Sequence, residues 1–138
     1  MMSTNGYLTP LPMPSPDTAP YWEGLRHGQF LVQCCLGCGK KRHYPRPVCD
    51  ACYSLDAEWV AIKVEGTLQS WTVCRHAFLP EFKEQLPYVV AIAEFEQGIR
   101  VNLRLEVPPD QPLRAGDPVR LVYRQVSEQL TLPVLALA

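Results

Sequence analysis

Two Cys-x-x-Cys pairs are the feature of this 138-residue chain that most restricts its fold. They read Cys35-Leu-Gly-Cys38 and Cys49-Asp-Ala-Cys52, with ten residues between the pairs. A tight turn within each pair directs both thiolates toward one point, and two such turns supply the tetrahedral sulfur site that zinc accepts. Gly39, directly after the first pair, suits the positive φ that often ends such a turn. So short a segment buries no core of its own, so metal binding would supply its folding free energy, on the order of 10 kcal/mol or more.

The four thiolates predict a closed, structural metal site. Four protein ligands leave no position for water or substrate, which argues against a catalytic metal. Iron is an open alternative to zinc, because a rubredoxin-type site uses the same ligands. Disulfides would need an oxidising compartment, and residues 1–20 have neither the basic start nor the apolar run of a secretory signal. We therefore expect a cytoplasmic protein with reduced, metal-binding thiols.

Two further cysteines are predicted to lie outside this site. Cys34 and Cys35 are neighbours on an extended segment, where side chains alternate, so both cannot face one ion. Cys74 lies in a later apolar strand and is expected to be a small buried hydrophobe. A nucleophilic Cys74 beside His76 is the alternative, since positions i and i+2 share a strand face.

Composition indicates a globular protein with one ordinary core, or a small core plus a metal-held module. Hydrophobic residues make up 47% of the chain, which argues against disorder. The formal net charge of −1 argues against a nucleic-acid surface over the whole chain. No apolar stretch approaches the roughly 20 residues of a membrane helix, so we expect no membrane partner. Fourteen prolines favour extended segments and loops over helices.

The order of elements predicts four segments. They are an extended proline-rich arm over residues 1–16, a short helix over 17–28, a zinc ribbon over 29–56 and a barrel over 57–138. In the arm, alternate positions from Pro10 to Pro16 are proline, which favours polyproline II.

The helix is predicted over about Pro20 to His27, with Asp17 or Thr18 as its N-cap and Gly28 as its stop. Two turns are too few to be stable alone in water. Its apolar face must therefore pack on this protein's own core or in the groove of a partner. That docking face consists of Tyr21, Trp22 and Leu25.

The C-terminal segment reads as a small Greek-key barrel of the oligonucleotide/oligosaccharide-binding (OB) type. Gly66 interrupts a long strand pattern, which indicates a bulge or a bend at a barrel corner. An SH3-like barrel is the alternative, because strand periodicity alone does not separate the two. One strand, Gln29–Cys34, is expected before the first cysteine pair. The strands expected after the second pair are Trp59–Val64, Thr67–Cys74, Tyr88–Phe95, Ile99–Leu105, Val119–Val126 and Leu130–Leu137, with a tight hairpin at Gln97-Gly98.

Two groups of residues are candidates for contact with an anionic ligand or a partner. The basic run between the cysteine pairs is either a solvated face or a small anion site, since cations on a metal-stiffened loop suit phosphate groups. The connection over residues 76–87 carries more apolar side chains than a solvated loop needs. The candidates are Lys40, Lys41, Arg42 and Arg46 from the run, and Arg75, His76, Phe78 and Phe82 from the connection and its start.

No catalytic constellation is recognisable in the sequence. It contains no Gly-x-Ser-x-Gly elbow, no phosphate-binding glycine loop and no His-x-x-x-His pair. His27, His43 and His76 are scattered, and we expect each to be a surface or loop residue. Catalysis by this chain alone is therefore not expected.

A series of short motifs surrounds the cysteine pairs. They are Tyr21-Trp22-Glu23-Gly24-Leu25, Leu31-Val32-Gln33, Pro45-Arg46, Glu58-Trp59-Val60, Gly66-Thr67-Leu68-Gln69-Ser70-Trp71-Thr72-Val73, Pro87-Tyr88-Val89-Val90-Ala91, Leu113-Arg114-x-Gly116 and Leu132-Pro133-Val134. In order and spacing, over about residues 19–136, the chain resembles the OB-fold acyl-CoA-associated proteins that carry an N-terminal rubredoxin-like zinc ribbon. Two departures occur: Cys34 stands where the family often has arginine, and no proline follows Cys49. Neither affects the four expected ligands.

The resemblance implies an accessory role. Members of this family typically form a complex with a thiolase-like protein, which carries the catalytic groups. The small protein stabilises that partner and helps to hold or pass the coenzyme A (CoA) thioester. We therefore expect a hetero-oligomer with a thiolase, acyltransferase or retro-aldolase, in which the basic and apolar candidates above contact CoA or the partner.

Two other classes of function stay open. Zinc ribbons and OB barrels also occur in nucleic-acid-binding modules, although the balanced charge argues against this. Gel shifts with single-stranded DNA or RNA that weaken steeply with salt would favour that class. The chain is alternatively a stand-alone acyl-CoA-binding protein. Calorimetry with CoA distinguishes this class, because an accessory subunit is expected to bind CoA weakly without its partner.

Overall fold

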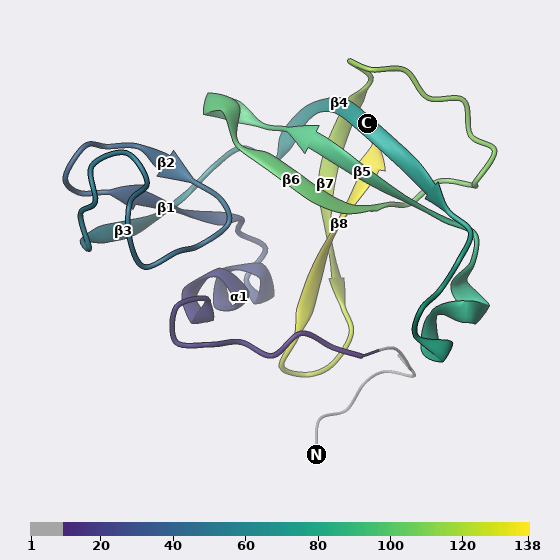
Figure 1. Cartoon of the computed structure of the whole chain (residues 1–138), viewed down its shortest axis with the longest axis horizontal. Coiled ribbons are helices and arrows are strands. Elements are labelled where there is room, and N and C mark those ends of the chain that lie inside the picture. Colours follow the sequence, from purple (N-terminus) through teal and green to yellow (C-terminus); the bar gives the residue numbers. More distant parts are fainter. Residues whose placement is uncertain (1–9) are drawn as a thin grey trace.

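A small antiparallel sheet forms the N-terminal part of the chain in the computed structural model, which describes residues 10–138 (Figure 1). Its strands are β1 (Leu31–Cys35), β2 (Lys41–Arg42) and β3 (Ala57–Ala61), in the order β2-β1-β3. Because β3 pairs with β1 along its whole length, residues 57–61 belong to this ribbon sheet, and the barrel strands begin later than the expected boundary at residue 57.

The C-terminal part is a closed five-stranded barrel. Its strands are β4 (Glu65–Cys74), β5 (Tyr88–Glu94), β6 (Arg100–Leu105), β7 (Pro118–Gln125) and β8 (Thr131–Leu137). Their order around the barrel is β4-β5-β6-β8-β7, with one parallel pairing, between β6 and β8. This Greek-key order confirms the OB-type barrel and excludes the SH3-like alternative.

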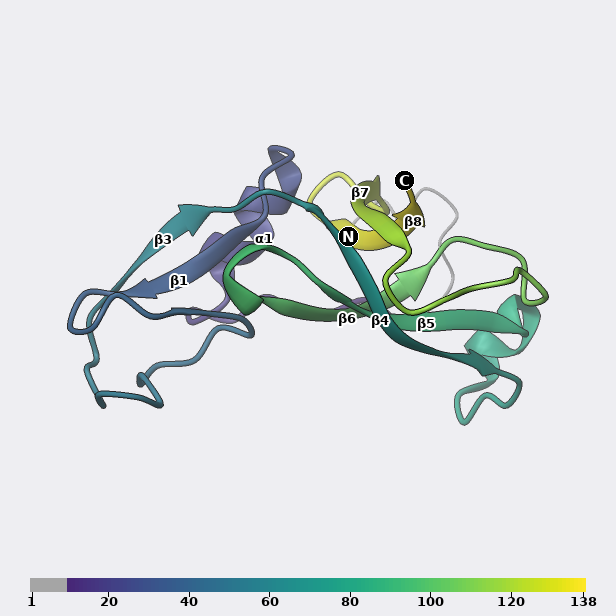
Figure 2. The same cartoon turned by 90° about the horizontal axis from the view of Figure 1, so that it is seen from above.

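Helix α1 (Ala19–Arg26) connects the two parts, which lie side by side along the long axis of the molecule (Figure 2). It contacts β1 of the ribbon and β7 and β8 of the barrel. One continuous hydrophobic core runs through all three, from Leu25 of α1 and Phe30 and Val32 of the ribbon to Leu68 and Val89 of the barrel. The ribbon and the barrel therefore share one core and are not separate units joined by a linker.

The helix begins one residue earlier than its sequence pattern predicts. Thr18 is its N-cap residue, but the Thr18 hydroxyl makes no capping bond. That hydroxyl instead accepts a hydrogen bond from the Ser15 N–H at 2.9 Å. Gly28 ends the helix as expected, with a φ of 69°. Of the predicted proline-rich arm, residues 1–9 lie outside the described residues.

Strand β4 runs through Gly66 without a break. The irregularity predicted for this strand lies further along, where the pairing with β5 shifts register between Leu68 and Ser70. The tight connection at Gln97-Gly98 is confirmed: both residues have positive φ, of 58° and 75°. The expected loop over 76–87 contains a short 3-10 helix over Pro80–Gln85. None of the helices within residues 10–138 has the length and apolarity that a membrane crossing requires.

Candidate metal centre and docking surface

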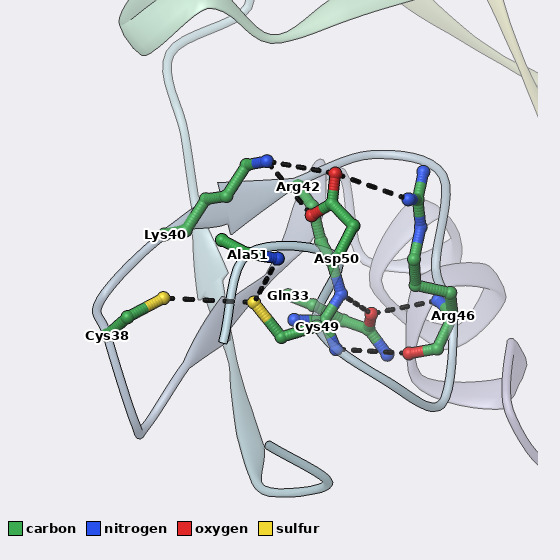
Figure 3. Close-up of polar contacts among 8 residues, drawn as sticks. All are labelled: Gln33, Cys38, Lys40, Arg42, Arg46, Cys49, Asp50 and Ala51. Carbon is green, nitrogen blue, oxygen red and sulfur yellow. Dashed lines mark hydrogen bonds and ion pairs between the residues drawn. The ribbon is translucent and has the colours of Figure 1, made fainter. Parts of the chain in front are cut away.

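The four cysteine sulfurs converge in the ribbon. Cys35 ends β1, Cys38 follows in the next turn, and Cys49 and Cys52 come from the loop between β2 and β3. All four Sγ atoms lie within 4.8 Å of one another. The Cys35 and Cys52 sulfurs are 3.5 Å apart. The sulfurs of Cys38 and Cys49, drawn in Figure 3, are 3.7 Å apart. A zinc ion bound tetrahedrally at about 2.3 Å needs sulfurs about 3.8 Å apart, so the four cysteines are positioned to bind such a metal ion.

The backbone around each cysteine pair supports this geometry. The Gly37 N–H donates to Cys35 Sγ at 3.3 Å, and the Ala51 N–H donates to Cys49 Sγ at 3.4 Å. Gly39, directly after the first pair, has the positive φ that the sequence predicts, at 78°. The two turns therefore present their sulfurs in the same way to one point.

Hydrogen bonding within the site drives the pKa values of its thiols apart. The Cys38 N–H is the main cause that lowers the pKa of Cys35 to about 6, and the Cys52 N–H is the main cause that lowers the pKa of Cys49. The Ser54 N–H acts to lower the pKa of Cys52, but the hydrogen bond with Cys35, desolvation and the other two cysteines together outweigh this and raise the pKa to about 12. Four thiols this close cannot all ionise alone, because like charges repel. A divalent ion supplies the positive charge that lets all four act as thiolate ligands.

The four predicted ribbon cations do not form one free basic patch. Lys40 Nζ donates to both carboxylate oxygens of Asp50, at 2.9 and 3.0 Å, and Arg46 lies 3.7 Å from the same carboxylate (Figure 3). Lys40 thereby holds the pKa of Asp50 below its usual value. Arg42 is buried, and Lys41 is half-buried without a carboxylate partner among residues 10–138. Asp50, which the sequence analysis did not single out, thus pairs with two of the four charges.

The connection between β4 and β5 presents its apolar side chains to solvent. Phe78 is 93% exposed and Leu79 is 49% exposed. The His76 ring packs edge-on against the Phe78 ring, with centroids 4.8 Å apart. Arg75 is exposed and Phe82 is half-buried. This connection and the ribbon lie at opposite ends of the molecule (Figure 1), so the structure does not bring the two predicted contact groups together.

The apolar face of α1 packs mainly within the protein's own core. Tyr21 is 7% exposed and Leu25 is 1% exposed, and the Tyr21 ring packs edge-on against Phe30 with centroids 5.6 Å apart. Trp22 is half-buried. Of the three predicted docking residues, Leu25 is thus buried in the core, while Tyr21 and Trp22 also line a surface groove.

This groove lies between α1 and the barrel and has a volume of about 400 Å³. Its walls are mostly apolar and include Tyr44 of the ribbon, Leu103 of β6 and Leu132 of β8. Two lining residues, Arg124 and Glu106, form a two-bond ion pair with distances of 3.0 and 2.6 Å. The groove has the size and the polarity of an apolar side-chain or small-ligand site with a charged edge.

Comparison with known proteins identifies the family. Residues 22–58 match the model of the ChsH2 rubredoxin-like zinc ribbon domain, and residues 59–124 match that of the ChsH2 C-terminal OB-fold domain. The chain belongs to the ChsH2/DUF35 family. This membership agrees with the resemblance seen in the sequence. The two matched domains, a zinc ribbon followed by an OB fold, are the two parts that the structure shows in the same order.

Three relatives illustrate the range of this family. A solved chain of an "Ltp2-ChsH2(DUF35) aldolase" is 33% identical, with a TM-score of 0.79, and the match covers 92% of this chain and 98% of that one. A "DUF35 domain-containing scaffold protein" of Methanothermobacter thermautotrophicus is 35% identical over 69% of this chain and 71% of its own length. A "Probable enoyl-CoA hydratase alpha subunit" of Thermomonospora curvata is 34% identical over 92% of this chain. This ChsH2-type chain spans only 39% of that hydratase subunit.

His43 of this ChsH2-type ribbon lies in the loop after β2, as the sequence allows, but its ring is largely covered by its neighbours. Its ring lies among aromatic rings, with centroids 5.4 Å from Tyr21, 5.2 Å from Phe30 and 4.0 Å from Tyr44. Its Nδ1 is buried without a hydrogen-bond partner among the described residues. Burial lowers the pKa of His43 to about 4. The burial was hidden from sequence analysis because His43 stands inside a run of cations, and only the adjacent Tyr44 hints at it.

We expect His43 to make the stability of the protein depend on pH. The unfolded chain takes up a proton near pH 6.5, whereas the folded protein resists protonation until about pH 4, so stability is lost as pH falls through this window. The loss approaches about 3 kcal/mol. Urea unfolding of the wild type and of His43→Phe, at several pH values with zinc present, tests this. Acid effects on the thiolates are common to both proteins, so identical pH dependence of the two would contradict the expectation.

Proposed function

We propose that this chain is a non-catalytic accessory subunit of an acyl-CoA-processing enzyme. It docks on a thiolase-like protein (a thiolase, acyltransferase or retro-aldolase), stabilises it and helps to hold the CoA thioester. The observation that carries the proposal is the match to nearly the whole length of a chain in the "Ltp2-ChsH2(DUF35) aldolase". Relatives named as a scaffold protein and as a hydratase subunit support the same role.

Two surface features fit a docking role. Phe78 and Leu79 expose large apolar side chains to water at one end of the barrel. Exposed apolar patches of this kind mark surfaces that a partner covers. The groove beside Trp22 offers a second apolar surface. The one cluster of metal-ligand side chains among residues 10–138 is the four-thiolate site, which has no open position for a substrate. The proposed chemistry therefore belongs to the partner.

The proposed metal is zinc, and its proposed role is to keep the ribbon folded against α1 and the barrel. CoA phosphates would be met by the exposed side chains of Arg75 and His76 beside the apolar loop. Of the ribbon cations, Lys41 is the one that is partly exposed and has no carboxylate partner among the described residues. We place the complex in the cytoplasm, where acyl-CoA enzymes and reduced thiols coexist.

The proposal predicts a stable complex in the native cell. The tagged chain, purified from its own organism, is expected to bring down a thiolase-like protein, identified by mass spectrometry. Phe78→Ser is expected to weaken that complex about 10-fold or more, because a central apolar anchor typically contributes at least this much to binding. Tyr53→Ser, which removes a 78% exposed ring from the ribbon, is the matched control with a smaller expected effect. A monomeric chain without any acyl-CoA enzyme attached would refute the proposal.

A further inference from the structure

The guanidinium of Arg42 is a buried charge with only neutral partners. Arg42 is 5% exposed. Its Nε donates to the Gln33 side-chain oxygen at 2.7 Å, and its Nη2 donates to the Arg46 carbonyl at 3.0 Å. Its Nη1 is buried and has no hydrogen-bond partner among the described residues. No carboxylate within residues 10–138 forms an ion pair with it. Such a charge is costly to bury unless an opposite charge lies nearby.

The contacts of Arg42 tie it to both halves of the metal site. Arg42 on β2 pairs with Gln33 on β1, and Gln33 lies two residues before Cys35, so their side chains share one face of the strand. The Gln33 side-chain oxygen also accepts the Arg46 N–H at 2.9 Å, and Arg46 lies three residues before Cys49. Figure 3 shows this network together with the sulfur atoms of Cys38 and Cys49. The guanidinium is thus fixed next to the segments that supply two of the four thiolates.

Positive charge in the surroundings would stabilise the metal site. A divalent ion with four thiolates carries a net charge of about minus two, and the N–H bonds to sulfur supply dipoles but no full charge. Lys40 and Arg46 are already engaged with the carboxylate of Asp50. Arg42 is the buried cation of the ribbon that forms no ion pair within the described residues, although the exposed Asp17 lines the same surface groove. The negative metal site and the guanidinium without an ion-pair partner therefore complement each other.

We propose that Arg42 is the counter-cation of the metal–tetrathiolate site, held in place by Gln33. In this role Arg42 binds no metal and contacts no substrate. It is a positioning residue that raises the affinity of the four thiolates for a divalent ion through its charge. Mutation of residues that surround and orient metal ligands typically changes metal affinity by about 10- to 100-fold, and we expect the charge of Arg42 to act within this range.

Gln33→Glu is the sharpest test. A glutamate oxygen can accept the same two hydrogen bonds, from Arg42 and from the Arg46 N–H, so the network keeps its shape. Its negative charge, however, neutralises the guanidinium next to the metal site. The zinc affinity, measured by competition with a chromophoric chelator at fixed pH and salt, is expected to fall about 10-fold or more. The spectrum of the Co²⁺-substituted protein is expected to stay that of a tetrahedral four-thiolate site.

Three further variants separate charge from structure. Arg42→Met is expected to lose about 10- to 100-fold in zinc affinity, and Arg42→Lys less, because lysine keeps the charge. Lys41→Met removes the same charge from the neighbouring position, whose side chain lies on the opposite face of β2, and is expected to cost less than about 3-fold.

Each alternative outcome overturns the proposal. If Gln33→Glu binds zinc as tightly as the wild type, the role of Arg42 is one of hydrogen bonding only. If Lys41→Met loses as much affinity as Arg42→Met, the effect belongs to the overall charge of the ribbon. An altered Co²⁺ spectrum in Gln33→Glu would assign its loss to a distorted site. A wild-type protein that binds neither Zn²⁺ nor Co²⁺ would remove the basis of the proposal, whatever its partner.

Discussion

Cys38→Ser is expected to release the metal ion and unfold the ribbon. A serine hydroxyl is a neutral, weak ligand, so three thiolates are left for an ion that needs four. The ribbon has few buried apolar side chains of its own, and metal binding supplies folding free energy on the order of 10 kcal/mol in domains of this kind. Elemental analysis of the purified variant is expected to show loss of most of its bound zinc. Hydrogen exchange is expected to show the unprotected amides mainly within β1–β3.

The matched control for this variant is Cys74→Ser. Cys74 ends β4 of the barrel and does not belong to the four-sulfur cluster, so its replacement is expected to leave the metal content unchanged. Equal zinc content in wild type and Cys38→Ser would refute the ligand assignment. Equal loss in both variants would instead indicate general thiol damage.

Loss of the ribbon is expected to reach the barrel through the shared core. Phe30, which leads into β1, packs its ring against Phe95 at the end of β5, with centroids 6.1 Å apart. Tyr21 of α1 packs against Phe30 as well. An unfolded ribbon would remove Phe30 from the rings of Tyr21 and Phe95, so the barrel of the metal-free protein is expected to be less stable too. The groove beside α1 would lose the wall that Tyr44 of the ribbon supplies.

The metal site could be predicted from sequence because its geometry is local. Each Cys-x-x-Cys pair fixes two sulfurs through one turn, and Gly39 supplies the positive φ at the end of the first turn. The barrel could be predicted for a similar reason: glycine, proline and alternating apolar residues mark the strands and connections one by one. Strand ends differed by one or two residues in most cases.

Features that depend on contacts distant in sequence could not be predicted. Whether His43 is exposed is decided by Tyr21 and Phe30, which reach it only once α1 has packed on the ribbon. Lys40 pairs with Asp50, which lies ten residues later and within the second cysteine pair. This ion pair depends on the fold of the metal site, so nothing in the sequence indicated that the basic run has a carboxylate partner. Strand β3 looked like part of the barrel because the sequence does not state that β1 is its partner.

Gly66→Ala is expected to destabilise the barrel by about 3 kcal/mol or more. A Cβ at this position would lie 2.1 Å from the Glu94 carbonyl oxygen and 2.6 Å from Cδ1 of Phe95. The backbone cannot shift to relieve this clash, because Gly66 is paired with Val119 of β7 while the next residue, Thr67, is paired with Glu94 of β5. The sequence predicted a bulge or a bend at Gly66, but the structure gives a different reason for this glycine: two strands and an aromatic ring meet where only a hydrogen atom fits.

Urea unfolding of the zinc-loaded proteins measures the free energy of unfolding that Gly66→Ala loses. Gly28→Ala is the matched control, because a Cβ at Gly28 meets no atom within 4 Å and the substitution is opposed only by the positive φ of 69°. That conformational strain costs about 1 to 2 kcal/mol. If Gly66→Ala unfolds at the urea concentration of the wild type, or loses no more stability than Gly28→Ala, the close approach of β4 to the end of β5 does not constrain the barrel. A larger loss in Gly66→Ala, with unchanged zinc content, would place the constraint in the barrel and separate it from the metal site.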